Sequence, residues 1–218
     1  MGREIDLLKN YPVSKRNLDE RAKKTEVERQ IARKFGKEFF DGDRRFGYGG
    51  FNYNPKFWTN VVKDFINYWQ LDKSSSILDV GCAKGFMIYD FLRLIPELRI
   101  EGIDISDYAI QNCKKEISHL LKVSDAKNLP YEDNSFDYVI SINTIHNLPE
   151  DECINAIKEI KRVSKKSSFI TVDAFNNEEE KERMYKWNLT AKTIMSTTEW
   201  KKLFKEHSYQ GDYYWFIP

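Results

Sequence analysis

From residue 76 onward, short apolar stretches alternate with segments in which apolar residues recur at helical spacing. The apolar stretches predict strands at residues 76–80, 99–104, 121–124, 136–142 and 168–173. The segments between and after them predict helices at residues 85–95, 106–119, 150–163 and 198–207. Strands that are apolar on both faces and alternate with helices are typical of a parallel sheet covered on both sides. We therefore predict a doubly wound, mostly parallel, Rossmann-like α/β sheet with helices on both faces.

The residues before this region follow another pattern. Residues 18–40 carry apolar side chains at roughly helical spacing on a polar background and predict one helix. A loop rich in glycine and aromatic residues follows at 41–55. We expect residues 1–55 to form a helical N-terminal lid and residues 56–218 to form the main domain, within a single-domain chain.

The pattern near the other end is less regular. Residues 176–197 are polar and then aromatic, and they fit neither a helical nor a strand template. Residues 211–217 predict a final strand, which we expect to be antiparallel and to lie at an edge of the sheet.

Composition narrows the functional classes. The chain has 218 residues and a net charge of +1, without the basic excess that duplex nucleic acid usually requires, so we expect no nucleic-acid partner. No apolar run reaches membrane-spanning length and the N-terminus has no signal-peptide core, so we expect no membrane partner. Cys82, Cys113 and Cys153 lie far apart and form no zinc pattern, which favours a cytoplasmic location and no metal site. The oligomeric state stays open.

The residues between Ser76 and Phe86, SILDVGCAKGF, are the most informative segment. They combine a buried strand, Asp79 at its tip, a turn with Gly81 and Gly85, and the start of a helix. Bare backbone beside a helix N-terminus at the carboxyl edge of a parallel sheet is where nucleotide-like ligands bind. Asp104 ends the next predicted strand, at the position where an acid accepts both hydroxyls of a ribose. The two signals together predict an adenosine-containing ligand.

Two further signals follow in order. The stretch SDAKNLP at 124–130 brings an acid directly after the third strand, and DNSFDYVIS at 133–141 leads into the fourth. Together with the glycine turn and Asp104, these segments resemble the class I S-adenosylmethionine-dependent methyltransferases that modify small molecules. The resemblance covers roughly residues 76–173. It implies S-adenosylmethionine as the cofactor, S-adenosylhomocysteine as its product and a small molecule as the methyl acceptor.

The resemblance assigns the residues of the glycine turn to the methionine part of the cofactor. Asp79, Gly81 and Cys82 are expected along the methionine moiety, and Gly85 is expected to open the helix beneath it. The family usually has another glycine where this chain has Ala83. Alanine is tolerated there if its backbone φ is negative.

The resemblance also assigns the adenosine part. Asp104 is expected to hold the ribose hydroxyls and Ile105 to pack on the adenine. Asp125 and the Ala126 amide are expected at the adenine amino group, and Asn143 is expected to line the methyl-donor pocket. Each acid has a structural alternative: Asp79 could be a helix N-cap, and Asp104 could cap the helix at 106, although Ser106 could serve that cap itself.

Two residues are candidates for the catalytic base. His146 follows the fourth strand and is the first choice, because its ordinary pKa is near neutral. Asp173, at the tip of the fifth strand, is the second. The alternative for His146 is packing or capping of the next helix, and the alternative for Asp173 is capping of a turn.

The acceptor is expected to meet residues of the lid. Tyr48 and Tyr53 could face the sulfonium or a sugar ring, and Trp187 could form another wall. Arg44 and Arg45 could contact a phosphate of the acceptor. Alternatively, the lid aromatics pack the N-terminal helix onto the sheet.

These signals predict methyl transfer to a small polar acceptor, with a hydroxyl of a sugar, nucleotide-sugar or phosphorylated metabolite favoured. One alternative is a catalytically silent module that binds an adenosyl ligand. Another is a nicotinamide oxidoreductase, which is disfavoured because Gly81 and Gly85 do not match the dinucleotide spacing. The residues 143–146, NTIH, lack the Asn/Asp-Pro-Pro-aromatic motif of nucleic-acid amine methylases, which argues against base methylation.

Overall fold

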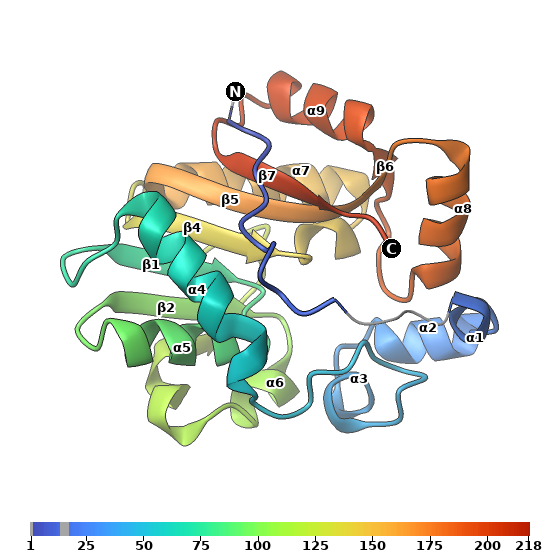
Figure 1. Cartoon of the computed structure of the whole chain (residues 1–218), viewed down its shortest axis with the longest axis horizontal. Helices are drawn as coiled ribbons and strands as arrows, with labels where there is room; N and C mark the ends of the chain where they lie inside the picture. Colours follow the sequence, from blue (N-terminus) through green and yellow to red (C-terminus); the bar gives the residue numbers. More distant parts are fainter. Residues whose placement is uncertain (1, 14–17) are drawn as a thin grey trace.

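The computed structural model describes residues 2–13 and 18–218, and it contains one open sheet with helices on both faces (Figure 1). The central strands lie in the order β3-β2-β1-β4-β5. Their bounds are β1 Ser76–Val80, β2 Arg99–Asp104, β3 Leu121–Val123, β4 Phe136–Ile142 and β5 Ser164–Phe175. Every pairing among them is parallel. The predicted doubly wound, Rossmann-like sheet is thereby confirmed.

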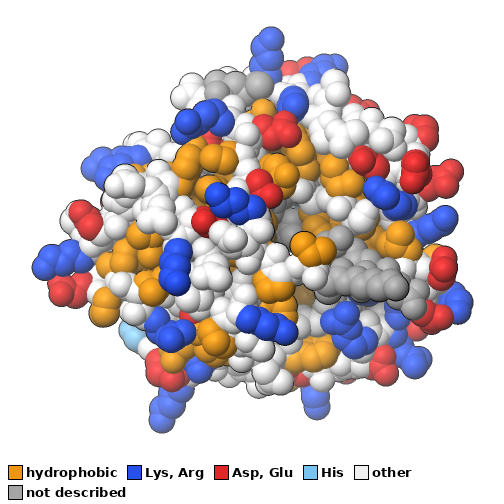
Figure 2. Space-filling view, viewed as in Figure 1, with side chains coloured by type: hydrophobic (Ala, Val, Ile, Leu, Met, Phe, Trp, Pro, Cys, Tyr) orange, Lys and Arg blue, Asp and Glu red, His pale blue; other side chains and the backbone are white. Residues whose placement is uncertain are grey.

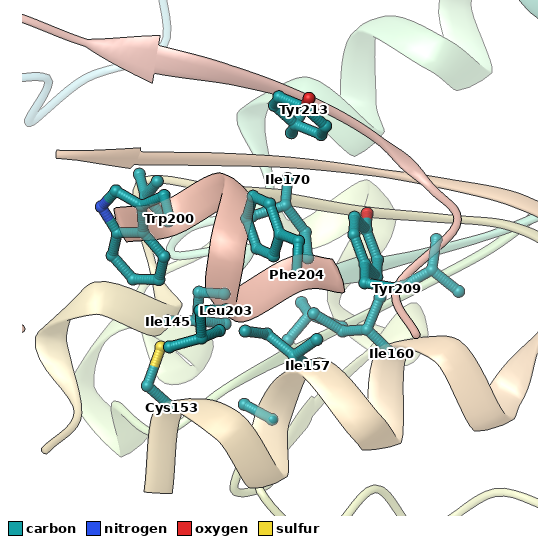
Figure 3. Close-up of a cluster of buried hydrophobic side chains, with 14 of the residues drawn as sticks. Ile145, Cys153, Ile157, Ile160, Ile170, Trp200, Leu203, Phe204, Tyr209 and Tyr213 are labelled. Carbon is teal, nitrogen blue, oxygen red and sulfur yellow. The ribbon is translucent and has the colours of Figure 1, made fainter. Parts of the chain in front are cut away.

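Helices α4 (Pro55–Trp69) and α5 (Phe86–Leu94) cover one face of the sheet. They bury Phe65 and Phe91 against Ile77 and Phe169 of the strands. Helices α7 (Glu150–Val163) and α9 (Thr197–Glu206) cover the other face. On that side, Trp200, Leu203 and Phe204 of α9 pack with side chains of α7 (Figure 3). The sheet is therefore buried on both faces between two apolar clusters.

Residues 18–40 do not form one helix, so that prediction is wrong. They form α1 (Leu18–Ala22) and α2 (Glu26–Ala32), followed by α3 (Lys37–Asp41). Thr25 is the N-cap of α2, because its side chain accepts from the Glu28 N–H in a capping box. Phe35 has a left-handed φ of 49° directly before Gly36, the extended N-cap of α3. These local signals outweigh the apolar periodicity.

Two other helices differ from prediction. The segment 106–119 is helical only in α6 (Asp107–Gln111), after which a 3-10 helix runs from Lys115 to Leu120. Asn112 ends α6, and its side-chain amide donates to the Tyr108 carbonyl. The segment 176–197 contains a helix that was not predicted, α8 (Glu178–Trp187). Only Met184 of α8 is buried, so its sequence lacks an apolar stripe.

The C-terminal strand β7 (Asp212–Phe216) pairs with β5 in parallel, so the expected antiparallel direction is wrong. The chain reaches β7 through α9, and a helical crossover returns the chain in the same direction. Before that crossover, the two-residue strand β6 (Met195–Ser196) pairs with the end of β5.

The N-terminal segment lies along the free edge of β7. The Ile5 N–H donates to the Tyr213 carbonyl and the Tyr213 N–H donates to the Arg3 carbonyl, each at 3.0 Å. The Arg3 N–H donates to Oδ1 of Asp212 at 2.8 Å. Leu7 is buried in the cluster beneath α4. Residues 3–7 are thus packed on the sheet, whereas α1–α3 lie beyond its edge (Figure 1).

The surface carries charges of both signs. Figure 2 shows Lys and Arg side chains intermixed with Asp and Glu over the face in view. Within residues 2–13 and 18–218, no helix combines the length and the apolar character needed to span a bilayer. In the same described residues, no group of three His, Cys, Asp or Glu side chains could hold a metal ion.

Candidate functional site

The turn between β1 and α5 requires a left-handed backbone at three positions. Gly81 has a φ of 85°, Ala83 of 50° and Gly85 of 69°. A Cβ at Gly81 would overlap the Thr144 side chain, and one at Gly85 would lie 2.7 Å from Cδ1 of Ile117. Both glycines are therefore needed. The condition under which alanine would be tolerated at position 83, a negative φ, is not met, and alanine in this conformation costs about 1 kcal/mol.

Asp104 fixes this turn from the end of β2. Its Oδ2 accepts from the Ala83 N–H and its Oδ1 accepts from the Ser106 N–H, both at 2.8 Å. Burial raises the pKa of Asp104, although the two backbone hydrogen bonds act in the opposite direction. Ser106, not Asp104, caps α6 by accepting from the Ala109 N–H. Each Asp104 oxygen still has acceptor capacity for a ribose hydroxyl.

Asp79 is a buried carboxyl group without a donor. Its residue is 4% exposed, and no group among the described residues donates a hydrogen bond to its side chain. Burial, together with the nearby charge of Asp104, raises the pKa of Asp79 to about 8. Burying a carboxylate without a partner is costly, so this position favours a cationic ligand group.

Cys82 lies beneath the turn. A Cβ at Gly102 of β2 would lie 2.8 Å from its Sγ, so β2 and the thiol pack closely. Burial raises the pKa of the Cys82 thiol well above its ordinary value. Its N–H and that of Gly81 both donate to the Ile103 carbonyl, at 2.9 and 2.8 Å. Cys82 therefore contributes backbone geometry and packing rather than a reactive thiolate.

The residues predicted to meet adenine lie beside Asp104. Ile105 is 56% exposed, which makes it a large apolar side chain uncovered at the edge of the turn. The Ser124 N–H donates to the Asp104 carbonyl at 3.0 Å and so brings Asp125 to the same edge. Asp125 accepts from the Lys127 N–H at 3.1 Å, and Ala126 packs against the apolar cluster below. A flat base placed here would cover Ile105.

Lys84 joins this turn to the N-terminal segment. Its buried ammonium lies 2.6 and 2.7 Å from the two oxygens of Asp41 and 3.0 Å from the Phe51 carbonyl. The Tyr108 hydroxyl donates to the same carboxylate at 2.8 Å. The Ser106 hydroxyl donates to the Phe35 carbonyl. The loops after β1 and β2 thus both hold the segment that contains α3.

His146 and Asp173 meet at the carboxyl ends of β4 and β5. Nδ1 of His146 accepts from the Asp173 N–H at 3.0 Å, and its Nε2 lies 3.6 Å from Oδ1 of Asp173. Nδ1 as acceptor requires the proton of the neutral ring to be on Nε2. Burial lowers the pKa of His146 to about 3 and raises the pKa of Asp173 to about 7. Asp173 is therefore the member of the pair that titrates near neutral pH.

Asn143 holds the end of β4 to β5 close to this pair. It has a left-handed φ of 52°. Its N–H donates to the Thr171 carbonyl and hydroxyl, at 3.1 and 3.0 Å, and its side-chain oxygen accepts from that hydroxyl at 3.0 Å.

The predicted acceptor residues are not all brought together. Tyr48 and Trp187 lie with ring centroids 5.6 Å apart, and the Tyr48 hydroxyl accepts from the Leu189 N–H at 2.8 Å. Burial raises the pKa of Tyr48, and the charge of Asp173 adds to the effect. Tyr48 therefore packs on Trp187 and anchors the chain at Leu189.

The other three predicted acceptor residues have local partners. Tyr53, in the loop before α4, packs against α5, where its hydroxyl donates to the buried Asp90 at 2.6 Å. The Arg44 guanidinium donates to the Tyr48 carbonyl at 2.6 Å. Arg45 is exposed and pairs with Asp43 at 3.3 Å.

Residues 71–212 match the family model of a methyltransferase domain. The chain belongs to the class I S-adenosylmethionine-dependent methyltransferases. This agrees with the resemblance in the sequence, and the matched residues include β1 to α9 of the fold.

The methyltransferase has relatives with different acceptors in their names. It is 36% identical over 127 residues to tRNA (carboxymethyluridine(34)-5-O)-methyltransferase of Arabidopsis thaliana, covering 57% of this chain and 30% of the relative. It is 29% identical over 157 residues to demethylmenaquinone methyltransferase of Staphylococcus aureus, covering 70% of this chain and 61% of the relative. The chain thus spans less than two thirds of the length of these relatives.

Solved structures share the fold. The MccD protein superposes with a TM-score of 0.54 at 23% identity, covering 71% of this chain and 72% of its own. The YcgJ protein of Bacillus subtilis superposes with a TM-score of 0.55 at 17% identity, and the match covers 67% of this chain and 66% of the YcgJ chain.

Sequence reasoning missed two residues of the methyltransferase that the structure brings to the site. Lys84 stands within the glycine turn, but its partner Asp41 is 43 positions away and no local pattern connects them. Arg21 contacts both Tyr48 and Trp187, at 4.9 and 4.7 Å from their ring centroids. It lies on a stretch that periodicity treats as the polar side of a helix, so only the fold could identify it.

Proposed function

We propose that this chain transfers the methyl group of S-adenosylmethionine to a hydroxyl of a small polar acceptor, such as a sugar, nucleotide-sugar or phosphorylated metabolite. The observation that carries the proposal is the buried, unpaired carboxyl of Asp79 beside Asp104, at a turn that requires glycine at two positions. Such a carboxyl suits the ammonium of a methionine moiety.

The residues present fit the cofactor. Asp79 would hold its ammonium, Asp104 its ribose hydroxyls and the exposed Ile105 its adenine face. When bound, the cofactor supplies a methyl group activated by positively charged sulfur. The protein then has to align the acceptor and remove a proton from it.

In the proposed step, Asp173 accepts the proton of the acceptor hydroxyl. The cofactor would supply the methyl group to the hydroxyl oxygen and keep the electron pair of the broken bond on sulfur, and the hydroxyl proton would pass to a carboxylate oxygen of Asp173. A pKa of about 7 suits this task at neutral pH. We assign His146 the role of a positioning residue, because its Nδ1 lone pair already accepts from the Asp173 N–H.

The N-terminal segment would close over the acceptor. Tyr48 and Trp187 would form an aromatic wall beside Asp173, and the Lys84–Asp41 ion pair would hold the segment to the cofactor turn. Such a cover excludes water from the reacting groups.

Calorimetric titration with S-adenosylhomocysteine and with NAD tests the donor half. We expect binding of the first and none of the second. NAD binding without S-adenosylhomocysteine binding would overturn the proposal in favour of an oxidoreductase.

The acceptor half is tested with methyl-labelled S-adenosylmethionine and three acceptor pools: a small-metabolite extract, total tRNA and demethylmenaquinone. Label in a polar metabolite with a mass gain of one methylene supports the proposal. Label in tRNA or demethylmenaquinone would contradict the proposed acceptor and indicate the kind of acceptor that the names of the relatives give. Binding without label in any pool would favour a silent binding module.

A further inference from the structure

Arg21 is a buried cation at the side of the proposed acceptor site. It lies on α1 and is only 6% exposed. Its guanidinium carbon forms a triangle with the rings of Tyr48 and Trp187, at 4.9 and 4.7 Å from centroids that are 5.6 Å apart. The group is therefore held by aromatic faces from two segments far apart in sequence.

Within the part of the chain that the structure describes, the guanidinium has one hydrogen-bond acceptor. Two of its nitrogens donate to one acceptor, the Gly47 carbonyl, at 3.3 and 3.4 Å. Such bonds are long, and a guanidinium has five N–H donors. Among residues 2–13 and 18–218, no carboxylate forms an ion pair with Arg21. The remaining residues, Met1 and 14–17, contain no carboxyl side chain that could provide one.

The surroundings add positive charge. Burial lowers the pKa of Arg21, and the charges of Arg44 and Arg29 act in the same direction. The described residues provide no ion-pairing carboxylate for either of these arginines, whose hydrogen bonds run to the carbonyls of Tyr48 and Asn188. A buried charge without an opposite charge costs several kcal/mol, so this point favours an anion.

The position relative to Asp173 suggests which anion. Arg21 stacks on Tyr48, and the segment after α8 connects Tyr48 to the His146–Asp173 pair. The Leu189 N–H donates to the Tyr48 hydroxyl, and the Lys192 and Thr193 N–H groups donate to the His146 carbonyl. A ligand whose hydroxyl meets Asp173 and whose charged end meets Arg21 would cross the Tyr48 side chain. Ala22 and Lys186, which neighbour Arg21 and Trp187 in sequence, line an open groove of about 470 Å³ together with Arg29 and the acids Glu178 and Glu182.

We propose that Arg21 binds an anionic oxygen group of the methyl acceptor, a carboxylate or a phosphate. The inference rests on the proposed function and narrows its acceptor to an acidic molecule. It also moves anion recognition from Arg44 and Arg45, which the sequence favoured, to a residue on α1. A guanidinium suits this task because its planar fork pairs with two oxygens at once.

The experiment uses the full chain with inorganic phosphate and acetate as probes, against chloride at equal ionic strength. We expect phosphate or acetate to raise the melting temperature of the wild type, and the larger response identifies the preferred group. Arg21→Met should abolish that response. Arg45→Met, which removes an exposed arginine paired with Asp43, should keep it. No response beyond chloride, or an unchanged response in Arg21→Met, would overturn the inference.

Folding is controlled by S-adenosylhomocysteine titration of every variant. If Arg21→Met does not fold, Arg21→Lys decides, because it keeps the charge and removes the fork. We expect at least tenfold weaker phosphate binding in Arg21→Lys, with S-adenosylhomocysteine affinity unchanged. Equal phosphate affinity would overturn the inference. If the wild type did not bind S-adenosylhomocysteine, the proposed function would be refuted instead. Failure of the Arg21 inference and failure of the proposed function are therefore distinguishable.

Discussion

The Lys84 ammonium lies 2.6 Å from Oδ1 of Asp41, and this ion pair joins the glycine turn after β1 to the end of α3. The Lys84 side chain is 8% exposed, so the pair is shielded from solvent on the lysine side. Ordering of the glycine turn and of the N-terminal segment is therefore physically linked.

Lys84→Met should release that segment. Because the change leaves Asp41 without its main partner, we expect a loss of about 2 kcal/mol in the free energy of unfolding, measured in urea. Amide exchange should increase in residues 35–54. Lys73→Met is the matched control, since the Lys73–Glu97 pair is exposed on both sides and should contribute less than about 1 kcal/mol. Equal losses of stability in the two variants would contradict the proposed link between the Lys84–Asp41 ion pair and the N-terminal segment.

Asp104→Ala should weaken S-adenosylhomocysteine binding at least about tenfold, as measured by calorimetry. The change removes the proposed ribose acceptor and the two backbone hydrogen bonds that shape the turn. Asp107→Ala is the control, because this exposed acid contacts only Gln111 among the hydrogen bonds of the described residues. Unchanged affinity in Asp104→Ala would refute the assigned cofactor site.

Binding of S-adenosylhomocysteine at pH 7 should release close to one proton. The pKa of Asp79 is about 8 in the free chain, so its carboxyl is mostly protonated at pH 7, and a bound ammonium would lower that pKa. Titration in buffers of different ionisation enthalpy measures the release. Asp79→Asn should bind more weakly and release no proton. If proton release persisted in Asp79→Asn, a group other than Asp79 would be its source.

The free chain should lose stability between pH 6.5 and 8. Because the folded pKa of Asp79 exceeds its ordinary value of 3.8, the folded state holds more protons, and the free energy of unfolding falls as pH rises toward 8. Asp173, whose pKa is raised to about 7, adds to this fall below pH 7, whereas His146 acts in the opposite direction only below its ordinary pKa of 6.5. Asp79→Asn should remove up to about 1.4 kcal/mol per pH unit of this slope. Asp137→Asn should leave the slope intact, because the pKa of Asp137 is lowered.

Once an acceptor is known, its turnover should rise with pH through about 7, following Asp173. Asp173→Asn should lower turnover by about 10²- to 10⁴-fold while leaving S-adenosylhomocysteine affinity unchanged. His146→Phe should shift this pH profile and destabilise the fold by about 1–3 kcal/mol, because the Asp173 N–H loses its acceptor. Full turnover in Asp173→Asn would exclude it as the base.

Sequence patterning predicted the sheet well, since strands buried on both faces form unbroken apolar runs. The predicted bounds of β1, β2 and β4 match the structure. The prediction of helices from sequence patterning failed where local capping outweighs apolar periodicity, as at Thr25, and where a helix lies on the surface, as α8 does. The direction of β7 depends on the crossover through α9, which no local pattern encodes.

The candidate site divides in the same way. Asp79, Asp104 and the glycines could be predicted because each stands next to a strand end, where the sheet itself determines position. Lys84 and Arg21 could not, because their partners come from segments that only tertiary packing brings near. The roles of His146 and Asp173 depend on which ring nitrogen of His146 accepts the hydrogen bond from the Asp173 N–H, and the sequence does not specify this.

The pairing of Arg3 and Ile5 with Tyr213 has a practical consequence for anyone who shortens this chain. A variant that begins after residue 13 would leave the outer amides and carbonyls of β7 exposed, ready to template the same strand of another molecule. Aggregation of such a variant would result from the exposed edge of β7 and not from a defect in the cofactor site. Expression should therefore start upstream of Arg3.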